Sequence, residues 1–113
     1  MYIGRVDTAM NFVNKIALIT GVGRREGIGA AICRELAEQG YDIFFLLTGK
    51  AMICKWIHDI EKNDALILEE ELQGNGVKVA SLELDLMKVD SVEKSFKSVK
   101  NKLGIPDILI NNA

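Results

Sequence analysis

The chain has 113 residues, which is enough for one domain with its own hydrophobic core. Hydrophobic residues make up 49% of it and charged residues 27%, as in ordinary globular proteins, and the net charge of −2 gives no broad attraction to nucleic acid or acidic membranes. No apolar run approaches the ~20 residues that span a bilayer, and residues 1–14 lack the apolar core of a signal peptide.

The first readable part of the chain predicts a strand followed by a helix. Residues 15–20 form a short apolar run that ends at a glycine turn, which is typical of a strand. Ile28, Ile32 and Leu36 then recur every four residues, so we expect a helix that buries these three side chains. Gly40 follows the last of them and ends the predicted helix.

The middle of the chain predicts a buried strand and a second helix. Residues 42–47 are almost entirely apolar, which is typical of a strand covered on both faces of a parallel sheet. Residues 48–62 give no clear pattern. Asn63 or Asp64 can cap a helix that runs to about Gln73, with Leu68 and Leu72 facing the core, before the glycines at 74 and 76.

The last part predicts one more strand, helix and strand. Residues 77–84 form the third strand, and Asp90 with Glu93 resembles a capping box at the start of a helix. Residues 107–111 form the fourth strand. The apolar side chains expected on the inner face of the helix are Val92, Phe96, Val99 and Leu103.

Strands and helices therefore alternate along the whole chain. Strands joined by single helices must run parallel, and their crossovers are right-handed. The expected fold is α/β: a Rossmann-like, doubly wound, three-layer α-β-α sheet of order 3-2-1-4, truncated after the fourth strand, in a single domain over residues 1–113. Its ligand crevice should lie at the carboxyl ends of strands one and four, where the winding reverses.

The two cysteines do not have the spacing of a metal site. Cys54 and His58 would share one helical face, but two ligands do not make a closed site, so we expect no metal. The simplest interpretation is that Cys33 and Cys54 bind no metal and are reduced thiols of a cytoplasmic protein.

The turn between the first strand and the first helix is rich in glycine. Residues 20–29 read Thr-Gly-Val-Gly-Arg-Arg-Glu-Gly-Ile-Gly. Gly21 can adopt the positive φ of a tight turn, while Gly27 and Gly29 remove side chains where the backbone must approach a pyrophosphate. The unpaired N–H groups of the following helix would face that anion. The alternative is a glycine-rich turn that binds nothing.

Four short motifs together resemble the short-chain dehydrogenase/reductase family, over nearly the whole chain from about residue 12. In chain order they are Thr20-Gly21, Gly27-Ile28-Gly29, Asp85-Leu86 and Asn111-Asn112-Ala113. The loop departs from the family in length, because five residues, 22–26, separate the first two motifs where the standard pattern has three. A longer loop also occurs in the enoyl-reductase branch of the family, which stays open as an alternative.

The resemblance implies roles for the later motifs. Asp85 would meet the adenine amino group, with the N–H of Leu86 beside it, whereas the alternative for Asp85 is an Asx turn. Asn112 and Ala113 would lie near the adenosine ribose. Asn111 is expected instead to hold neighbouring strands together through its amide.

The choice of cofactor follows from charge. NAD sites place a carboxylate after the second strand to bind the ribose hydroxyls, but residues 46–50 around Thr48 contain no acid. Arg24 and Arg25 lie in the glycine loop, where either could bind a 2′-phosphate and favour NADP. The alternative is that both are solvated charges, and Glu26 partly offsets them.

The chemistry that the family performs is not carried by this chain. Family members use a Tyr, a Lys four residues later and a Ser beyond the fourth strand, whereas neither Tyr2 nor Tyr41 has a Lys at that spacing. No catalytic residue is assigned, so it is uncertain whether the chain by itself is an enzyme.

We therefore expect the NADP(H)-binding portion of an oxidoreductase similar to 3-oxoacyl carrier-protein reductases, inactive by itself, with a small-molecule or acyl substrate only in a full-length form. A non-catalytic module that binds a nucleotide or a partner, and a remnant that binds nothing, are the alternatives. The exposed edge of strand four would favour self-association. The expected cofactor-binding residues are Gly21, Arg24, Arg25, Gly27, Ile28, Gly29, Thr48, Asp85, Leu86, Asn112 and Ala113.

Overall fold

The structure, a computed structural model, describes residues 14–23, 25–48, 55–84 and 90–112, and only the backbone of residues 48, 55–58 and 61. A single parallel sheet has the strand order β3-β2-β1-β4, which confirms the predicted order. The elements are β1 (Ile16–Ile19), α2 (Ile28–Glu38), β2 (Asp42–Thr48), α3 (Lys55–Gln73), β3 (Val79–Leu84), α4 (Ser91–Lys102) and β4 (Ile108–Ile110).

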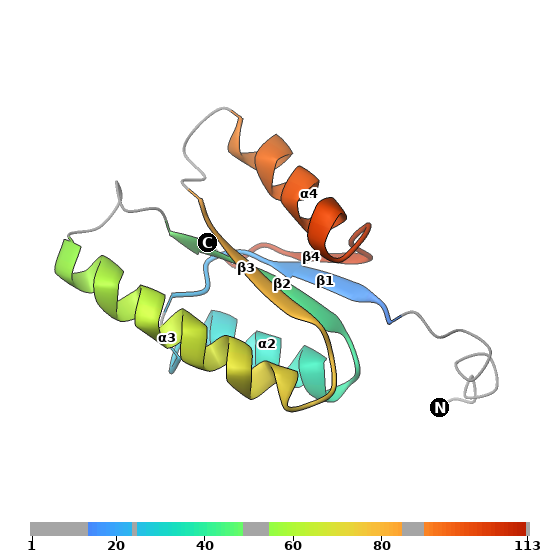
Figure 1. The fold of residues 1–113 in the computed structure, drawn as a ribbon, viewed down its shortest axis with the longest axis horizontal. Helices are drawn as coiled ribbons and strands as arrows, with labels where there is room; N and C mark the ends of the chain where they lie inside the picture. Colours follow the sequence, from blue (N-terminus) through green and yellow to red (C-terminus); the bar gives the residue numbers. More distant parts are fainter. Residues whose placement is uncertain (1–13, 24, 49–54, 85–89, 113) are drawn as a thin grey trace.

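The helices cover the sheet from both sides. Helices α2 and α3 lie on one face, and α4 lies on the other, so the described residues form the three layers that the alternating pattern predicts (Figure 1). Each strand feeds one helix and then the next strand, and consecutive strands run in the same direction. The carboxyl ends of β1 and β4, which are hydrogen-bonded neighbours, therefore open at the same edge of the sheet.

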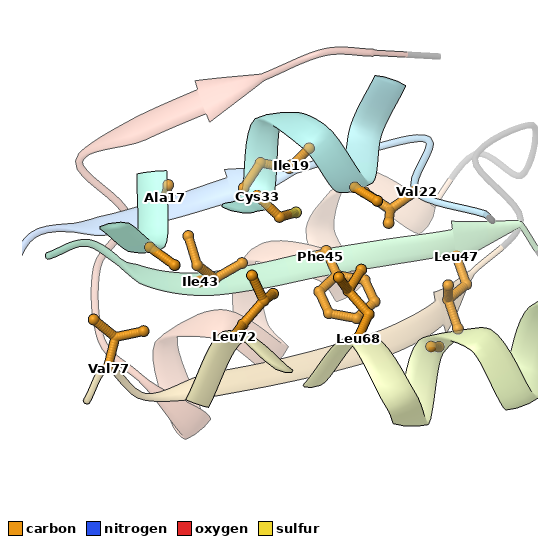
Figure 2. Packing of buried hydrophobic residues seen from close by; sticks show 13 residues of the cluster. Ala17, Ile19, Val22, Cys33, Ile43, Phe45, Leu47, Leu68, Leu72 and Val77 are labelled. Atoms are coloured by element: carbon orange, nitrogen blue, oxygen red, sulfur yellow. The ribbon is translucent and has the colours of Figure 1, made fainter. Parts of the chain in front are cut away.

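Strand β2 is the centre of the core, because alternate residues face opposite layers. Phe45 packs with Leu68 and Leu72 of α3, as Figure 2 shows, whereas Phe44 belongs to the cluster that includes Val99 of α4. Both phenylalanine side chains are fully buried. The prediction that this strand is covered on both faces is confirmed.

Helix α2 contacts the sheet through small residues rather than through the predicted isoleucine stripe. Ile28 is 74% exposed, so its expected burial was wrong, and Ile32 and Leu36 are only partly buried. The fully buried positions of α2 are Gly29, Ala30, Cys33 and Ala37. Small side chains allow the helix axis to lie close to the sheet, and this rotates the larger residues toward the rim of the contact.

Helix α3 starts well before the predicted cap. It begins at Lys55, so Asn63 and Asp64 lie inside the helix and the predicted start was wrong. The carboxylate of Asp64 instead accepts a hydrogen bond from the backbone N–H of Arg25 (3.2 Å), 39 residues away. A tertiary contact thus uses the side chain that the local pattern had assigned to a cap. The predicted end is confirmed, because α3 stops at Gln73 and Gly76 has a positive φ of 82°.

Helix α4 also differs from its local pattern. Asp90 is the N-cap residue but makes no capping hydrogen bond, and its carboxylate pairs with Lys94 at 3.2 Å, so the capping box is absent. Val92 is 58% exposed and Phe96 is 39% exposed, which contradicts their predicted burial. Ser91, Ser95 and Val99 are buried instead. On this face of the sheet Leu109 of β4 is left more than half exposed.

Carboxylates fasten the strands at the edge of the sheet where they begin. Asp107 accepts a hydrogen bond from the N–H of Ile16 (2.8 Å), which ties β4 to β1. Asp42 accepts hydrogen bonds from Asn14 (3.1 Å) and from the N–H of Lys78 (2.9 Å). All of these bonds lie at the amino ends of the strands. The carboxyl ends are joined by other groups.

Cys33 gives a direct test of this core. Burial raises the pKa of its thiol to about 12, so in the folded chain the reactive thiolate is about 1,000-fold rarer near pH 8 than in an unfolded chain. In a Cys54→Ser variant, where Cys33 is the remaining thiol, we expect negligible labelling by a chromogenic disulfide reagent in native buffer and rapid labelling in guanidinium chloride. Fast labelling in native buffer would contradict the packing of α2 on the sheet.

The β4 edge generates a second prediction, that the chain self-associates. Leu109 is 54% exposed on β4, which is paired with β1 alone among the described strands. Replacement of Leu109 with Lys adds a charge to this apolar edge and is expected to lower the sedimentation coefficient at high protein concentration. The matched control is Leu66→Lys, since Leu66 is 61% exposed on α3. Wild-type chain that sediments as a monomer at every concentration would contradict the prediction.

Candidate functional site

The ends of β1 and β4 are joined by the hydroxyl of Thr20. The backbone N–H of Thr20 donates to the carbonyl of Ile110 (3.0 Å), and its hydroxyl donates to Oδ1 of Asn111 (3.1 Å). The same hydroxyl accepts a hydrogen bond from the N–H of Asn112 (3.0 Å). Asn111 therefore holds neighbouring strands together through its side-chain amide, as the sequence predicted, and Thr20 is its partner.

The turn that follows β1 is held from both neighbouring strands. Gly21 has a positive φ of 70°, which permits the sharp change of direction. Its carbonyl accepts a hydrogen bond from the side chain of Asn112 (3.3 Å) beyond β4. On the other side, the N–H of Val22 donates to the carbonyl of Leu46 in β2 (3.1 Å). The path of the turn is thus set by three strands.

Gly29 brings the first turn of α2 against this loop. A Cβ atom at position 29 would lie 2.9 Å from the side-chain nitrogen of Asn112, 3.0 Å from the carbonyl oxygen of Gly21 and 3.0 Å from a methyl carbon of Val22. A side chain would therefore fit only if Asn112, Val22 or the backbone of the turn shifted. The third glycine of the motif is explained by this close approach between helix and turn.

The start of α2 offers N–H groups that have no acceptor within the helix. Gly27 is the N-cap in an extended conformation, and the first helical hydrogen bond runs from the N–H of Ala31 to the carbonyl of Gly27 (3.1 Å). The N–H groups of Ile28, Gly29 and Ala30 precede that bond and have no partner within the helix. The first turn contains no acidic residue, so the partial positive charge of the helix end is retained. These features fit an anion such as a phosphate.

Arg25, in the loop before α2, contacts helix α3. Its backbone N–H donates to the carboxylate of Asp64, and its Nε atom lies 3.6 Å from the other carboxylate oxygen. Its side chain is 41% exposed, while that of Asp64 is 13% exposed. Asp64 was missed as a site residue, because nothing in the local sequence links it to a loop that lies far away along the chain.

The structure brings together six of the predicted site residues around the ends of β1, β2 and β4. They are Gly21, Arg25, Gly27, Ile28, Gly29 and Asn112. The backbone of Thr48 ends β2, but its side chain is not described. Four further predicted residues lie outside the described part of the chain: Arg24, Asp85, Leu86 and Ala113.

A hollow of about 300 Å³ lies on the α4 side of the same strand ends. Polar groups of Thr20 and Asn111 meet there with apolar side chains of β1, β2, β4 and α4, including Phe96 and Leu109. In the described part of the chain, no three or more His, Cys, Asp or Glu side chains are grouped so that they could hold a metal ion. No helix in that part is long and apolar enough to cross a membrane.

Gly29→Ala tests the close approach of α2 to the turn. Alanine normally stabilises a helix relative to glycine by about 1 kcal/mol. Here the added methyl group meets a backbone carbonyl and a packed side chain, so we expect instead a loss of about 1–3 kcal/mol in the free energy of unfolding, measured by urea titration. A variant as stable as the wild-type chain, or more stable, would show that the helix does not approach the turn this closely.

The chain is similar to known proteins in sequence and in fold. A family model described as short chain dehydrogenase matches residues 15–113. The chain is 38% identical over 99 residues to the uncharacterized oxidoreductase YjdA of Bacillus subtilis, covering 88% of this chain and 36% of the relative. It is 34% identical over 101 residues to the 3-oxoacyl-[acyl-carrier-protein] reductase FabG of Staphylococcus epidermidis, covering 89% of this chain and 36% of the relative.

Among solved structures, a blue fluorescent protein from a metagenomic library, in complex with NADPH, matches with a TM-score of 0.73 and 34% identity. That match covers 91% of this chain and 37% of the other. The chain therefore spans little more than a third of the length of these relatives. Since the family model matches nearly the whole chain in sequence, and the sheet order agrees, the chain belongs to the short-chain dehydrogenase family.

Proposed function

We propose that this chain binds NADP(H), as one domain over residues 1–113, and that it is the cofactor-binding portion of an oxidoreductase that reduces a substrate carbonyl. The observation that carries the proposal is the start of α2, where three N–H groups without helical partners stand beside the turn after β1. Gly27 and Gly29 leave that position free of side chains. The pyrophosphate of a dinucleotide is the anion that this arrangement fits best.

The residues that would hold the dinucleotide come from the start of α2 and from the ends of β1 and β4. The N–H groups of Ile28 and Gly29 would bind the pyrophosphate, while Gly21 would let the backbone approach it. Asn112 fixes the turn from β4 and would lie close to the adenosine ribose. When bound, the cofactor supplies a hydride, and the chain's own residues bind and orient it.

The preference for NADP over NAD rests on Arg25. The sequence at the end of β2, Thr48-Gly49-Lys50, contains no carboxylate for the ribose hydroxyls, and Arg25 lies in the glycine loop, bonded to Asp64 of α3. A guanidinium group there would bind the 2′-phosphate that distinguishes NADP. The NADPH complex of the structural relative supports a nicotinamide dinucleotide as the ligand.

The remaining cofactor contacts are proposed from the family resemblance. They comprise a second loop cation at Arg24, the adenine contacts at Asp85 and Leu86, a contact at Thr48 after β2, and Ala113 at the ribose. The substrate class is proposed to be a 3-oxoacyl compound, which the name of the Staphylococcus epidermidis relative supports. We also propose a cytoplasmic location, which the free thiol of Cys33 supports.

Carbonyl reduction by the 113-residue chain alone is not part of the proposal. Neither of its tyrosines has a lysine four residues later, since positions 6 and 45 are Val and Phe. The groups described at the site can bind and orient a dinucleotide, but none is placed as a general acid. We propose that the chain by itself binds the cofactor without turning it over.

Binding is best tested by titration with the reduced cofactors, followed by their fluorescence. We expect NADPH to bind more tightly than NADH by about ten- to a hundredfold, because hydrogen bonds to charged groups contribute ~1.5–3 kcal/mol. Arg25→Gln should remove most of this preference and leave NADH binding unchanged. The matched control is Arg34→Gln, since Arg34 pairs with Glu71 between α2 and α3. Equal or reversed affinities in the wild-type chain would refute the role of Arg25.

A further inference from the structure

The loop that would bind the 2′-phosphate is anchored to a carboxylate in the interior of α3. Asp64 lies ten positions into a helix that runs from Lys55 to Gln73, so helix capping does not explain its charge. Its side chain is 13% exposed, and a carboxylate so nearly buried requires a partner. Arg25 supplies two contacts, a backbone N–H at 3.2 Å and the guanidinium Nε at 3.6 Å.

Only one of the two contacts between Arg25 and Asp64 is a hydrogen bond. The backbone N–H of Arg25 makes a hydrogen bond to Asp64, which fixes the position of the loop. The Nε atom is buried and makes no hydrogen bond to any described group, although the carboxylate lies near it. The pairing of the two side chains is therefore electrostatic. It offsets the charge of Arg25 without a hydrogen bond at Nε.

We propose that Asp64 is a specificity-determining residue, which holds Arg25 in place through its backbone and weakens the affinity of the site for a 2′-phosphate through its charge. This inference rests on the proposed function, because it concerns the same dinucleotide site. A phosphate bound at Arg25 would meet the negative charge of Asp64 behind the guanidinium group. NAD carries no phosphate at that position, so Asp64 affects NADP affinity and leaves NAD affinity unchanged.

The two roles of Asp64 can be separated by substitution. Asp64→Asn removes the charge and keeps an oxygen that can accept the N–H of Arg25. We expect this variant to bind NADPH about three- to tenfold more tightly, which is the size of effect for a nearby charge at a partly exposed site, with NADH affinity within about twofold of wild type. Asp64→Ser also removes the charge, but its shorter side chain does not reach the N–H of Arg25, so we expect a smaller gain in NADPH affinity than with Asp64→Asn.

A double-variant cycle links the effect to Arg25. In an Arg25→Gln background, Asp64→Asn should still tighten NADPH binding by removing the direct repulsion of the 2′-phosphate, and the difference from the gain in the wild-type background measures the charge that Asp64 offsets on Arg25. The control for general charge removal is Glu70→Gln, at an exposed position on the same helix. Titration of each variant with adenosine 2′,5′-bisphosphate and with adenosine 5′-monophosphate isolates the contribution of the 2′-phosphate.

The outcomes separate this inference from the proposed function. If the wild-type chain binds neither dinucleotide, the proposed function is overturned, and the inference with it. If it binds NADPH and both Asp64 variants bind it no more tightly, the inference alone is overturned. An equal gain for NADPH and NADH, or the same gain from Glu70→Gln, also overturns it, because the effect would then be general rather than directed at the 2′-phosphate.

Discussion

The site depends on the close contact between the first turn of α2 and the turn that follows β1. A Cβ atom at position 29 would lie only 2.9–3.0 Å from the carbonyl of Gly21 and the side chains of Val22 and Asn112, so the helix and the turn are in close contact there. The contact fixes where the free N–H groups of the helix lie relative to the end of β1. A helix that began a few ångströms farther away would carry the same partial charge but would leave it outside the crevice.

Hydrogen bonds from several elements maintain this contact. Thr20 joins the ends of β1 and β4, Asn112 reaches back from beyond β4 to the carbonyl of Gly21, and Val22 is bonded to β2. Asp64 of α3 then holds the loop at Arg25. The anion-binding position is therefore a product of tertiary structure, and changes in β4 or α3 should reach it even though neither belongs to the glycine motif.

Much of the fold could be predicted from the sequence, and the exceptions share one cause. The apolar run of β2, the glycine that ends each helix and the order of the strands follow from local pattern and from the rules for parallel crossovers.

The wrong predictions concern Ile28, Val92 and Phe96, whose helical spacing is correct but whose burial depends on which helix face meets the sheet. Asp64 was expected to cap a helix but lies inside α3 and bonds to a distant loop, whereas Asp90 does occupy the N-cap position of α4 but pairs its carboxylate with Lys94 instead of a backbone N–H. In the site, the glycines and Asn112 could be found from their motifs, whereas Asp64 could not, because its partner is far away in the sequence.

The most direct test is the response of individual backbone amides to the cofactor. In ¹H–¹⁵N spectra of the labelled chain titrated with NADPH, we predict the largest shifts at the amides of Ile28, Gly29 and Ala30, where the helix begins beside the glycine turn. Much smaller shifts are predicted for the amides of the buried strand β2. Saturable binding that leaves those three amides unmoved would contradict the conclusion that the turn after β1 and the start of α2 hold the pyrophosphate.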